Sequence, residues 1–152
     1  MLFFNFVIIF LKVNGMQNII RITSIFLLLI NGVGACYGGW QLFTDPTGKS
    51  MQLTIEWLQF SPFNDYLIPG IILFVANGLL SLIIAFLVII RYEKFPMLIV
   101  LQGNVLFIWI IIEMFLIQTI HPLHIIMGAV GIVLILLGFL IWNKIESNHH
   151  AE

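Results

Sequence analysis

The sequence predicts an all-α membrane protein, folded as an antiparallel bundle of four transmembrane helices with an interfacial outer loop. Hydrophobic residues make up 61% of the 152-residue chain and charged residues only 9%, whereas soluble domains carry roughly 25% charged residues. Four apolar runs are each long enough to cross a bilayer, which takes about 20 residues in a helix. The spans are expected at about residues 22–43, 67–90, 97–120 and 123–142.

These runs fill a single domain over residues 19–145, followed by a polar tail at residues 146–152. Residues 1–18 are set apart from this domain. Their apolar start, Met1–Leu11, is about half the length of a span and lacks the basic residues and cleavage site of a signal peptide. Two interpretations stay open: the segment lies in the membrane interface, or translation begins at Met16.

The first span carries small residues in its second half. Gly34 and Gly38 are spaced four residues apart, as are Ala35 and Gly39, and this spacing predicts a face that another helix backbone approaches closely. Asn31 lies near the middle of the same span. We expect its side chain to form a hydrogen bond across a helix interface.

The long connection after the first span begins with a turn signal, Asp45-Pro46-Thr47-Gly48. Alternating apolar residues follow, so the segment is expected in the membrane interface with Trp57 at the level of the lipid head groups. It forms either a lid over the bundle or a passive loop.

Small and polar residues also mark one face of two later spans. In the second span Gly70, Asn77, Ser81 and Ala85 are separated by seven, four and four residues, so they share one helical face. The expected close-packing positions of the fourth span are Gly128, Gly131 and Gly138.

The third span contains the residue that most needs an explanation, Glu113. An ionised, unpaired carboxylate in hydrocarbon costs roughly 3 kcal/mol or more. Gln102 lies eleven residues earlier, which places it on the same helical face as Leu106, Trp109 and Glu113. Asn104 falls on the opposite side, and Gln118 is a further polar residue of the span.

Depth and side-chain direction predict that Asn77 is the partner of Glu113. Side chains lean toward the N-terminus of their own helix, so the two groups should meet at one level from antiparallel helices. We expect His124 to lie one residue into the fourth span and to lean outward, away from Glu113. The next candidate for the partner of Glu113 is therefore Tyr37.

The histidines His121 and His124 are three residues apart and could present two imidazoles to a metal ion. The signal is weak because only two ligands are present and Pro122 favours a turn. The alternative is an interfacial turn with solvated rings.

Basic residues predict the orientation. One side of the membrane receives only Lys49, and the other side receives five basic residues, so the positive-inside rule places both termini in the cytoplasm. Those five are Lys12, Arg21, Arg91, Lys94 and Lys144.

The runs GVGACYGGWQLFTDPTGKSMQL, SPFNDYLIPGIILFVANG and HPLH resemble a family of small bacterial four-span membrane proteins with no assigned activity. The likeness covers about residues 30–130. It implies the four-helix topology and a bacterial inner membrane, and it transfers no catalytic role to any residue.

The favoured function is binding or moving a small solute or proton through a polar pocket in the outer half of the bundle. The alternative is a structural or accessory subunit without transport or catalytic activity. Expected partners are the lipid bilayer, a second copy of the chain and an unidentified small solute. The candidate pocket residues are Asn31, Tyr37, Asn77, Gln102 and Glu113.

Other function classes lack sequence support. The single cysteine, Cys36, excludes intrachain disulfide chemistry, and the absence of a basic cluster argues against nucleic acid. No cofactor or catalytic motif is present, so a membrane hydrolase or isomerase is the least favoured class.

Overall fold

The computed structural model describes residues 2–117 and 121–149, and the side chains of residues 15–117 and 121–143. Within these ranges the fold is all-α and contains no strand, as predicted. In chain order the elements are α1 (Leu2–Thr44), η1 (Lys49–Met51), η2 (Ile55–Leu58), α2 (Leu67–Ile72), η3 (Leu73–Leu79), α3 (Leu80–Ile89), α4 (Phe95–Ile117) and α5 (Pro122–His149).

Four of the helical stretches are long and apolar enough to span a membrane. They are Gly15–Thr44, Leu67–Ile89, Phe95–Ile117 and Pro122–Asn143. Large apolar side chains such as Phe26, Ile83 and Phe115 point outward from them. So extensive an apolar surface requires lipid as its solvent, and the chain is therefore a multi-pass integral membrane protein.

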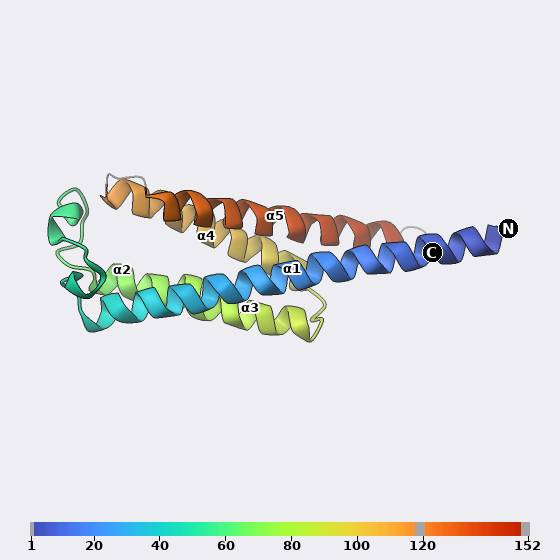
Figure 1. Ribbon diagram of the computed structural model, residues 1–152, viewed down its shortest axis with the longest axis horizontal. Helices are drawn as coiled ribbons and strands as arrows, with labels where there is room; N and C mark the ends of the chain where they lie inside the picture. The colour runs from blue at the N-terminus through green and yellow to red at the C-terminus, as the bar shows by residue number, and fades with distance from the viewer. Residues whose placement is uncertain (1, 118–120, 150–152) are drawn as a thin grey trace.

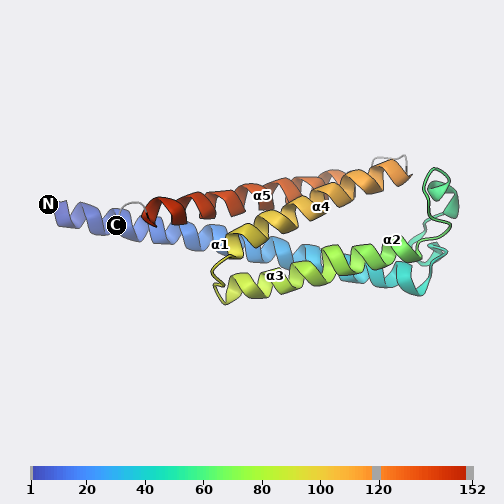
Figure 2. The same cartoon turned by 180° about the vertical axis from the view of Figure 1, so that it is seen from behind.

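The bundle is made of two antiparallel hairpins. Helix α1 packs along α2, η3 and α3, and α4 packs along α5 (Figures 1 and 2). Contacts of α3 with α4 and of α1 with α5 join the hairpins. A buried apolar core at this junction draws on all four passes and includes Leu28, Ile84, Val88, Ile99 and Leu134.

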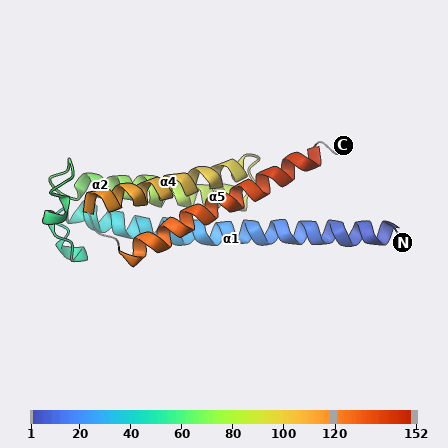
Figure 3. The same ribbon diagram turned by 90° about the horizontal axis from the view of Figure 1, so that it is seen from above.

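The N-terminal end of α1 and the C-terminal end of α5 lie toward the end of the bundle that carries the turn between α3 and α4, and the long loop closes the opposite end (Figure 1). Helix α1 is 43 residues long, about 65 Å at 1.5 Å per residue, against about 30 Å of hydrocarbon. Its N-terminal part runs on beyond the other helices (Figure 3). Residues 2–18 thus continue the first helix, and whether the fold requires them stays a prediction.

Two expected span ends compare differently with the structure. The fourth candidate span, Pro122–Asn143, ends one residue from the expected residue 142, although its helix continues to His149. The third helix is described to Ile117, and the expected end at residue 120 falls outside the described residues, together with Gln118.

Backbones approach most closely at a few glycines. A Cβ atom on Gly39 would lie 2.6 Å from the backbone nitrogen of Phe74 in η3, and one on Gly131 would lie 3.0 Å from the carbonyl oxygen of Gly103. The expectation for Gly39 is confirmed because α1 and η3 leave no room for a side chain there, and the expectation for Gly131 is confirmed because α4 and α5 come into close contact at this residue.

The prediction that Gly34 forms a contact face is wrong, because nothing lies within 4 Å of a Cβ built on it. Gly38 and Gly128 make only ordinary contacts, at 3.6 and 3.8 Å, whereas Gly138 is tight. The spacing identified the small residues, but the rotation of each helix about its axis decides which of them face a neighbour.

The second pass is not a uniform α-helix, because η3 is a π-helical segment. Side chains from two other helices reach its carbonyl groups: Asn31 Nδ2 donates to Asn77 O at 3.2 Å, and Gln102 Nε2 donates to Ala76 O at 3.3 Å. Insertion of side chains into the backbone ladder commonly accompanies such wide turns, which often lie at functional sites.

The loop between α1 and α2 is organised by Asp45. Its carboxylate accepts hydrogen bonds from the side chain of Thr47 at 2.6 Å and from the backbone N–H of Ser50 at 2.9 Å. These bonds hold the pKa of Asp45 below its ordinary value, because they stabilise the charged form. Gly48 adopts a positive φ of 74°, as the predicted turn requires.

The same loop is anchored to the bundle by Tyr66. Its ring packs with Leu42 and Leu58 in a small buried cluster, and its hydroxyl donates to Thr54 O at 2.8 Å. Burial raises the pKa of Tyr66 above its ordinary value. The loop is therefore folded against the helix ends, and it contains two short 3₁₀ turns, η1 and η2.

Candidate functional site

Helices α4 and α5 bring a carboxylate and an imidazole together near the end of the bundle that the long loop closes. Glu113 Oε2 lies 3.8 Å from His124 Nε2. The Glu113 side chain is 30% exposed and that of His124 only 7%. This separation allows an ion pair but is too long for a strong direct hydrogen bond.

The packing of the α4–α5 hairpin explains this pairing. Gly103 lies against Ile135, Phe107 against Gly131, and Ile110 against Gly128. Each step of three or four residues along α4 is matched by an equal step backward along α5. The next step of three residues pairs residue 113 with residue 125, the neighbour of His124, so the register of this glycine packing brings Glu113 to the start of α5.

The prediction that Asn77 is the partner of Glu113 is wrong. The side-chain polar atoms of Asn77, Nδ2 and Oδ1, have no hydrogen-bond partner in the described structure. Its backbone carbonyl accepts from Asn31 of α1. The depth argument compared the heights of the two residues along the bundle but did not determine which neighbouring helix each side chain faces. Glu113 faces α5, whereas Asn77 lies where η3 meets α1.

The proton on the His124 ring is placed by its surroundings. The backbone N–H of His121 donates to His124 Nδ1 at 3.3 Å, and the backbone N–H of His124 donates to His121 O at 3.0 Å. The first of these bonds is the one that an N3 side chain makes to the N-cap N–H in a capping box, here at the start of α5. Since Nδ1 accepts, a neutral His124 carries its proton on Nε2, the atom that faces Glu113.

The long loop reaches this pair through Trp57. Its ring centroid is 6.2 Å from that of His121, and the His121 ring meets that of His124 edge-on at 6.0 Å. Trp57 belongs to η2, which contacts α4. An aromatic residue of the loop thus lies beside the histidines that cover the end of the hairpin.

A polar face continues from this pair along α4. Gln102, Leu106 and Trp109 are buried and Glu113 is half-buried, so the expected shared face is turned into the protein. Trp109 Nε1 and Gln102 Oε1 are buried without a hydrogen-bond partner in the described structure. A buried polar atom left unpaired costs about 1–3 kcal/mol, which makes these two atoms available to a bound polar group.

Asn31 is placed in a different interface. Its Nδ2 donates to Ser81 Oγ at 2.7 Å across the contact between α1 and α3, and both residues are fully buried. The predicted hydrogen bond across a helix interface is therefore confirmed. Gly70, Asn77, Ser81 and Ala85, the expected seam of the second pass, are all buried.

The structure does not bring Tyr37 to Glu113. Tyr37 is 65% exposed on the surface of α1, and its hydroxyl accepts a hydrogen bond from Gln41 Nε2 at 3.2 Å. Asn104 is likewise exposed and bonds to the carbonyl of Val100 in its own helix.

Within the described residues, no three His, Cys, Asp or Glu side chains lie close enough together to hold a metal ion. The Nδ1 atom of His124 is already occupied by the N–H of His121. The two-histidine metal site stays a prediction with no third ligand from the described part of the chain.

Comparison with known proteins found no matching family model, no matching curated protein and no matching solved structure. The resemblance to a bacterial four-span family is therefore supported only in its architecture, four long apolar helices packed together. Any function has to be argued from the residues themselves.

Sequence reasoning considered His124 and set it aside. The signal that could have identified it is the register of small residues, because matching Gly103 with Gly131 across an antiparallel hairpin places Glu113 near the start of α5. The contribution of Trp57 depends on how the loop folds back over the bundle, and no local pattern predicts that.

Proposed function

We propose that this protein binds a proton, or a small solute that exchanges with one, at the Glu113–His124 pair and moves it along the polar face of α4. The observation that carries the proposal is the 3.8 Å approach of a carboxylate and an imidazole from two adjacent membrane-spanning helices. Ionisable residues within spans commonly mark proton or substrate pathways.

The chemistry follows from the two groups. With one shared proton the pair is either neutral or an internal ion pair, so it carries no net charge. A second proton leaves a neutral Glu113 beside a charged His124. Binding and release of that proton change the charge of the site, which is the property a proton-coupled carrier needs.

The groups around the pair support the same function. Trp109 and Gln102 offer unpaired polar atoms on the same helical face, and these atoms could bind a polar solute or a chain of water molecules. Trp57 beside His121 would limit access from the loop side. The loop then acts as a cover rather than as a passive connection.

Location and orientation belong to the same proposal. We assign the protein to a bacterial inner membrane with both termini in the cytoplasm. Arg91 and Lys94 lie in the turn between α3 and α4, Arg21 lines a pocket with Arg91, and Lys49 lies in the long loop. That turn and that loop lie at opposite ends of the bundle (Figure 1). This asymmetry supports the proposed orientation through the positive-inside rule, and in that orientation Glu113 and His124 lie in the outer half. Self-association stays a prediction.

The test is proton movement into vesicles that contain the purified protein. A pH-sensitive dye inside the vesicles reports the flux after the outside is acidified. Glu113→Gln and His124→Gln should reduce the flux to that of empty vesicles, because a glutamine side chain does not bind and release a proton near neutral pH. Asn104→Leu is the matched control: it removes a polar group from the exposed side of the same helix and should keep the wild-type rate.

A second measurement does not depend on transport. Infrared difference spectra recorded over a pH titration should contain a carboxyl band that disappears in Glu113→Gln, because the wild-type residue gains and loses a proton. Unchanged flux together with the absence of such a band would favour the alternative, a structural subunit in which Glu113 only stabilises packing. Melting curves of each variant in detergent would establish that it is folded.

A further inference from the structure

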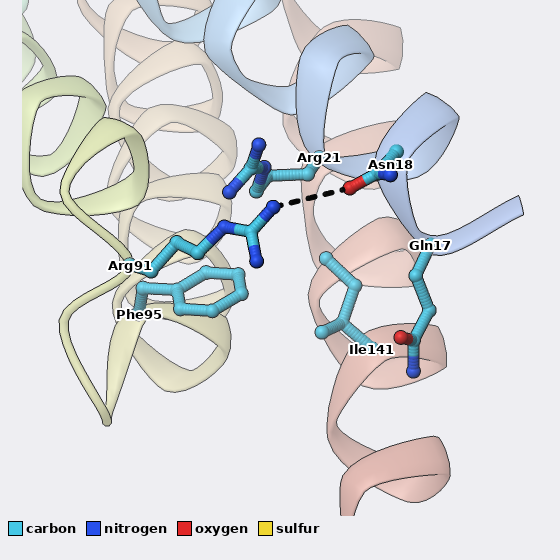
Figure 4. A pocket seen from close by; sticks show the side chains of 6 residues that line it. All are labelled: Gln17, Asn18, Arg21, Arg91, Phe95 and Ile141. Atoms are coloured by element: carbon cyan, nitrogen blue, oxygen red, sulfur yellow. Dashed lines mark hydrogen bonds between the residues drawn. The ribbon is translucent and has the colours of Figure 1, made fainter. Parts of the chain in front are cut away.

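A second polar site lies at the opposite end of the bundle, beside the turn that joins α3 to α4. It is a pocket of about 160 Å³ between α1, the turn that joins α3 to α4, and α5. Figure 4 shows that two arginines from different segments project into it. Its lining residues are Gln17, Asn18, Arg21, Arg91, Phe95 and Ile141.

The two guanidinium groups have no acidic partner in the described part of the chain. Arg21 Nε is buried and has no hydrogen-bond partner there, although it belongs to a group with five donors. Arg91 Nη2 makes one long hydrogen bond, 3.5 Å, to Asn18 Oδ1 (Figure 4). Two neighbouring positive charges without a counter-ion repel each other, so an anion between them would be stabilised by both.

The backbone at Arg91 supports a specific role for this side chain. The N–H of Tyr92 donates to Leu87 O and the N–H of Arg91 donates to Val88 O, which is the hydrogen-bond pattern of a Schellman helix end. That pattern requires a left-handed residue, usually glycine, and Arg91 adopts it with φ 55°. The chain thus holds an arginine in a conformation that is unfavourable for it.

The pocket also has an apolar side, formed by Phe95 and Ile141. Its depth is that of a lipid head group: Phe95 is the first residue of α4, Arg91 follows the second candidate span by two residues, and Ile141 is near the end of the fourth. A free anion in water gains nothing from apolar walls, whereas a phospholipid presents a phosphate and the start of its acyl chains together.

From this arrangement we propose that the pocket binds the phosphate group of an anionic phospholipid, held between Arg21 and Arg91. Guanidinium groups match phosphate oxygens with paired, charge-assisted hydrogen bonds. Basic pockets between transmembrane helices bind anionic head groups in this way. The site is separate from the Glu113–His124 pair and does not depend on the function proposed for it.

The experiment measures lipid binding to the purified, detergent-solubilised full chain by native mass spectrometry. The probes are a short-chain phosphatidylglycerol, a phosphatidylcholine of equal chain length, inorganic phosphate and glycerol phosphate. Wild-type protein should bind phosphatidylglycerol at least about tenfold more tightly than phosphatidylcholine, and Arg21→Gln and Arg91→Gln should each remove most of that preference.

Lys94→Gln is the matched control, because it removes one positive charge from the same end of the bundle. Lys94 is exposed and does not line the pocket. It should keep the wild-type preference. Equal losses in Lys94→Gln and the arginine variants would reduce the effect to general electrostatic attraction and overturn the proposal. Phosphate or glycerol phosphate competing as strongly as the lipid would show a soluble anion to be the ligand.

The variant at Arg21 needs a check on folding, because its side chain is partly buried. Arg91 is exposed, so Arg91→Gln should fold normally and tests the site by itself. Unchanged lipid preference in a folded Arg91→Gln protein would refute the role assigned to the pair of arginines.

Discussion

Replacing Gly39 with alanine should destabilise the bundle, whereas the same change at Gly34 should not. Both residues lie in α1, five positions apart and within the same span. A Cβ on Gly39 would lie 2.6 Å from Phe74 N and 2.8 Å from Gly70 O, and both are backbone atoms that cannot rotate away. Nothing lies within 4 Å of a Cβ on Gly34.

The expected magnitude follows from that geometry. The new methyl group is short of ordinary contact by about 0.8 Å, so α1 and the second pass have to separate. Overpacking of this kind costs about 1–3 kcal/mol. Separation also strains the hydrogen bond of Asn31 to Ser81 in the same helix pair, worth about 1 kcal/mol. The higher helix propensity of alanine offsets at most about 1 kcal/mol.

We therefore expect Gly39→Ala to lower the free energy of unfolding by about 1–3 kcal/mol. Gly34→Ala should change it by between zero and a gain of about 1 kcal/mol. The assay is reversible unfolding in mixed micelles of increasing denaturing-detergent content, followed by tryptophan fluorescence and circular dichroism. If the two variants proved equally stable, the close approach of α1 to η3 and the reasoning built on it would be refuted.

Two further predictions concern the long loop and the orientation. The hydrogen bonds of Asp45 lower its folded pKa, so the loop stability it contributes should be fully present above the unfolded pKa and lost as pH falls through the folded pKa. The protection of the loop amides, corrected for the intrinsic pH dependence of exchange, should therefore fall at acid pH in the wild type and show little pH response of this origin in Asp45→Asn. For orientation, in a Cys36→Ala background, Lys49→Cys should react with a membrane-impermeant maleimide on intact cells and Lys94→Cys should not. The reverse labelling pattern would invert the proposed topology.

The candidate site illustrates what sequence reasoning could reach. A carboxylate within an apolar run is conspicuous in the sequence alone, and helical spacing correctly placed Gln102, Trp109 and Glu113 on one face. The partner could not be obtained in the same way. Spacing within one helix says nothing about the rotation and axial shift of the next, and here both depend on the close packing of Gly103 with Gly131.

The arginines show the same limit. Arg21 and Arg91 are seventy residues apart in the sequence. From the sequence alone they contributed only to the prediction of membrane orientation. Their convergence on one pocket depends on where α1 lies relative to the turn after α3, which is a property of the assembled bundle.

The sequence by itself determined that this chain is a membrane protein, how many times it crosses and which polar residues lie within its spans. These follow from composition and from the length of apolar runs, because the energy of placing a residue in hydrocarbon is local to that residue. The tertiary structure alone decided that Glu113 meets His124, that Gly39 rather than Gly34 faces a neighbour, and that Arg21 and Arg91 share a pocket. Contacts between helices depend on rotation and register, which are set by the packing of all four passes together.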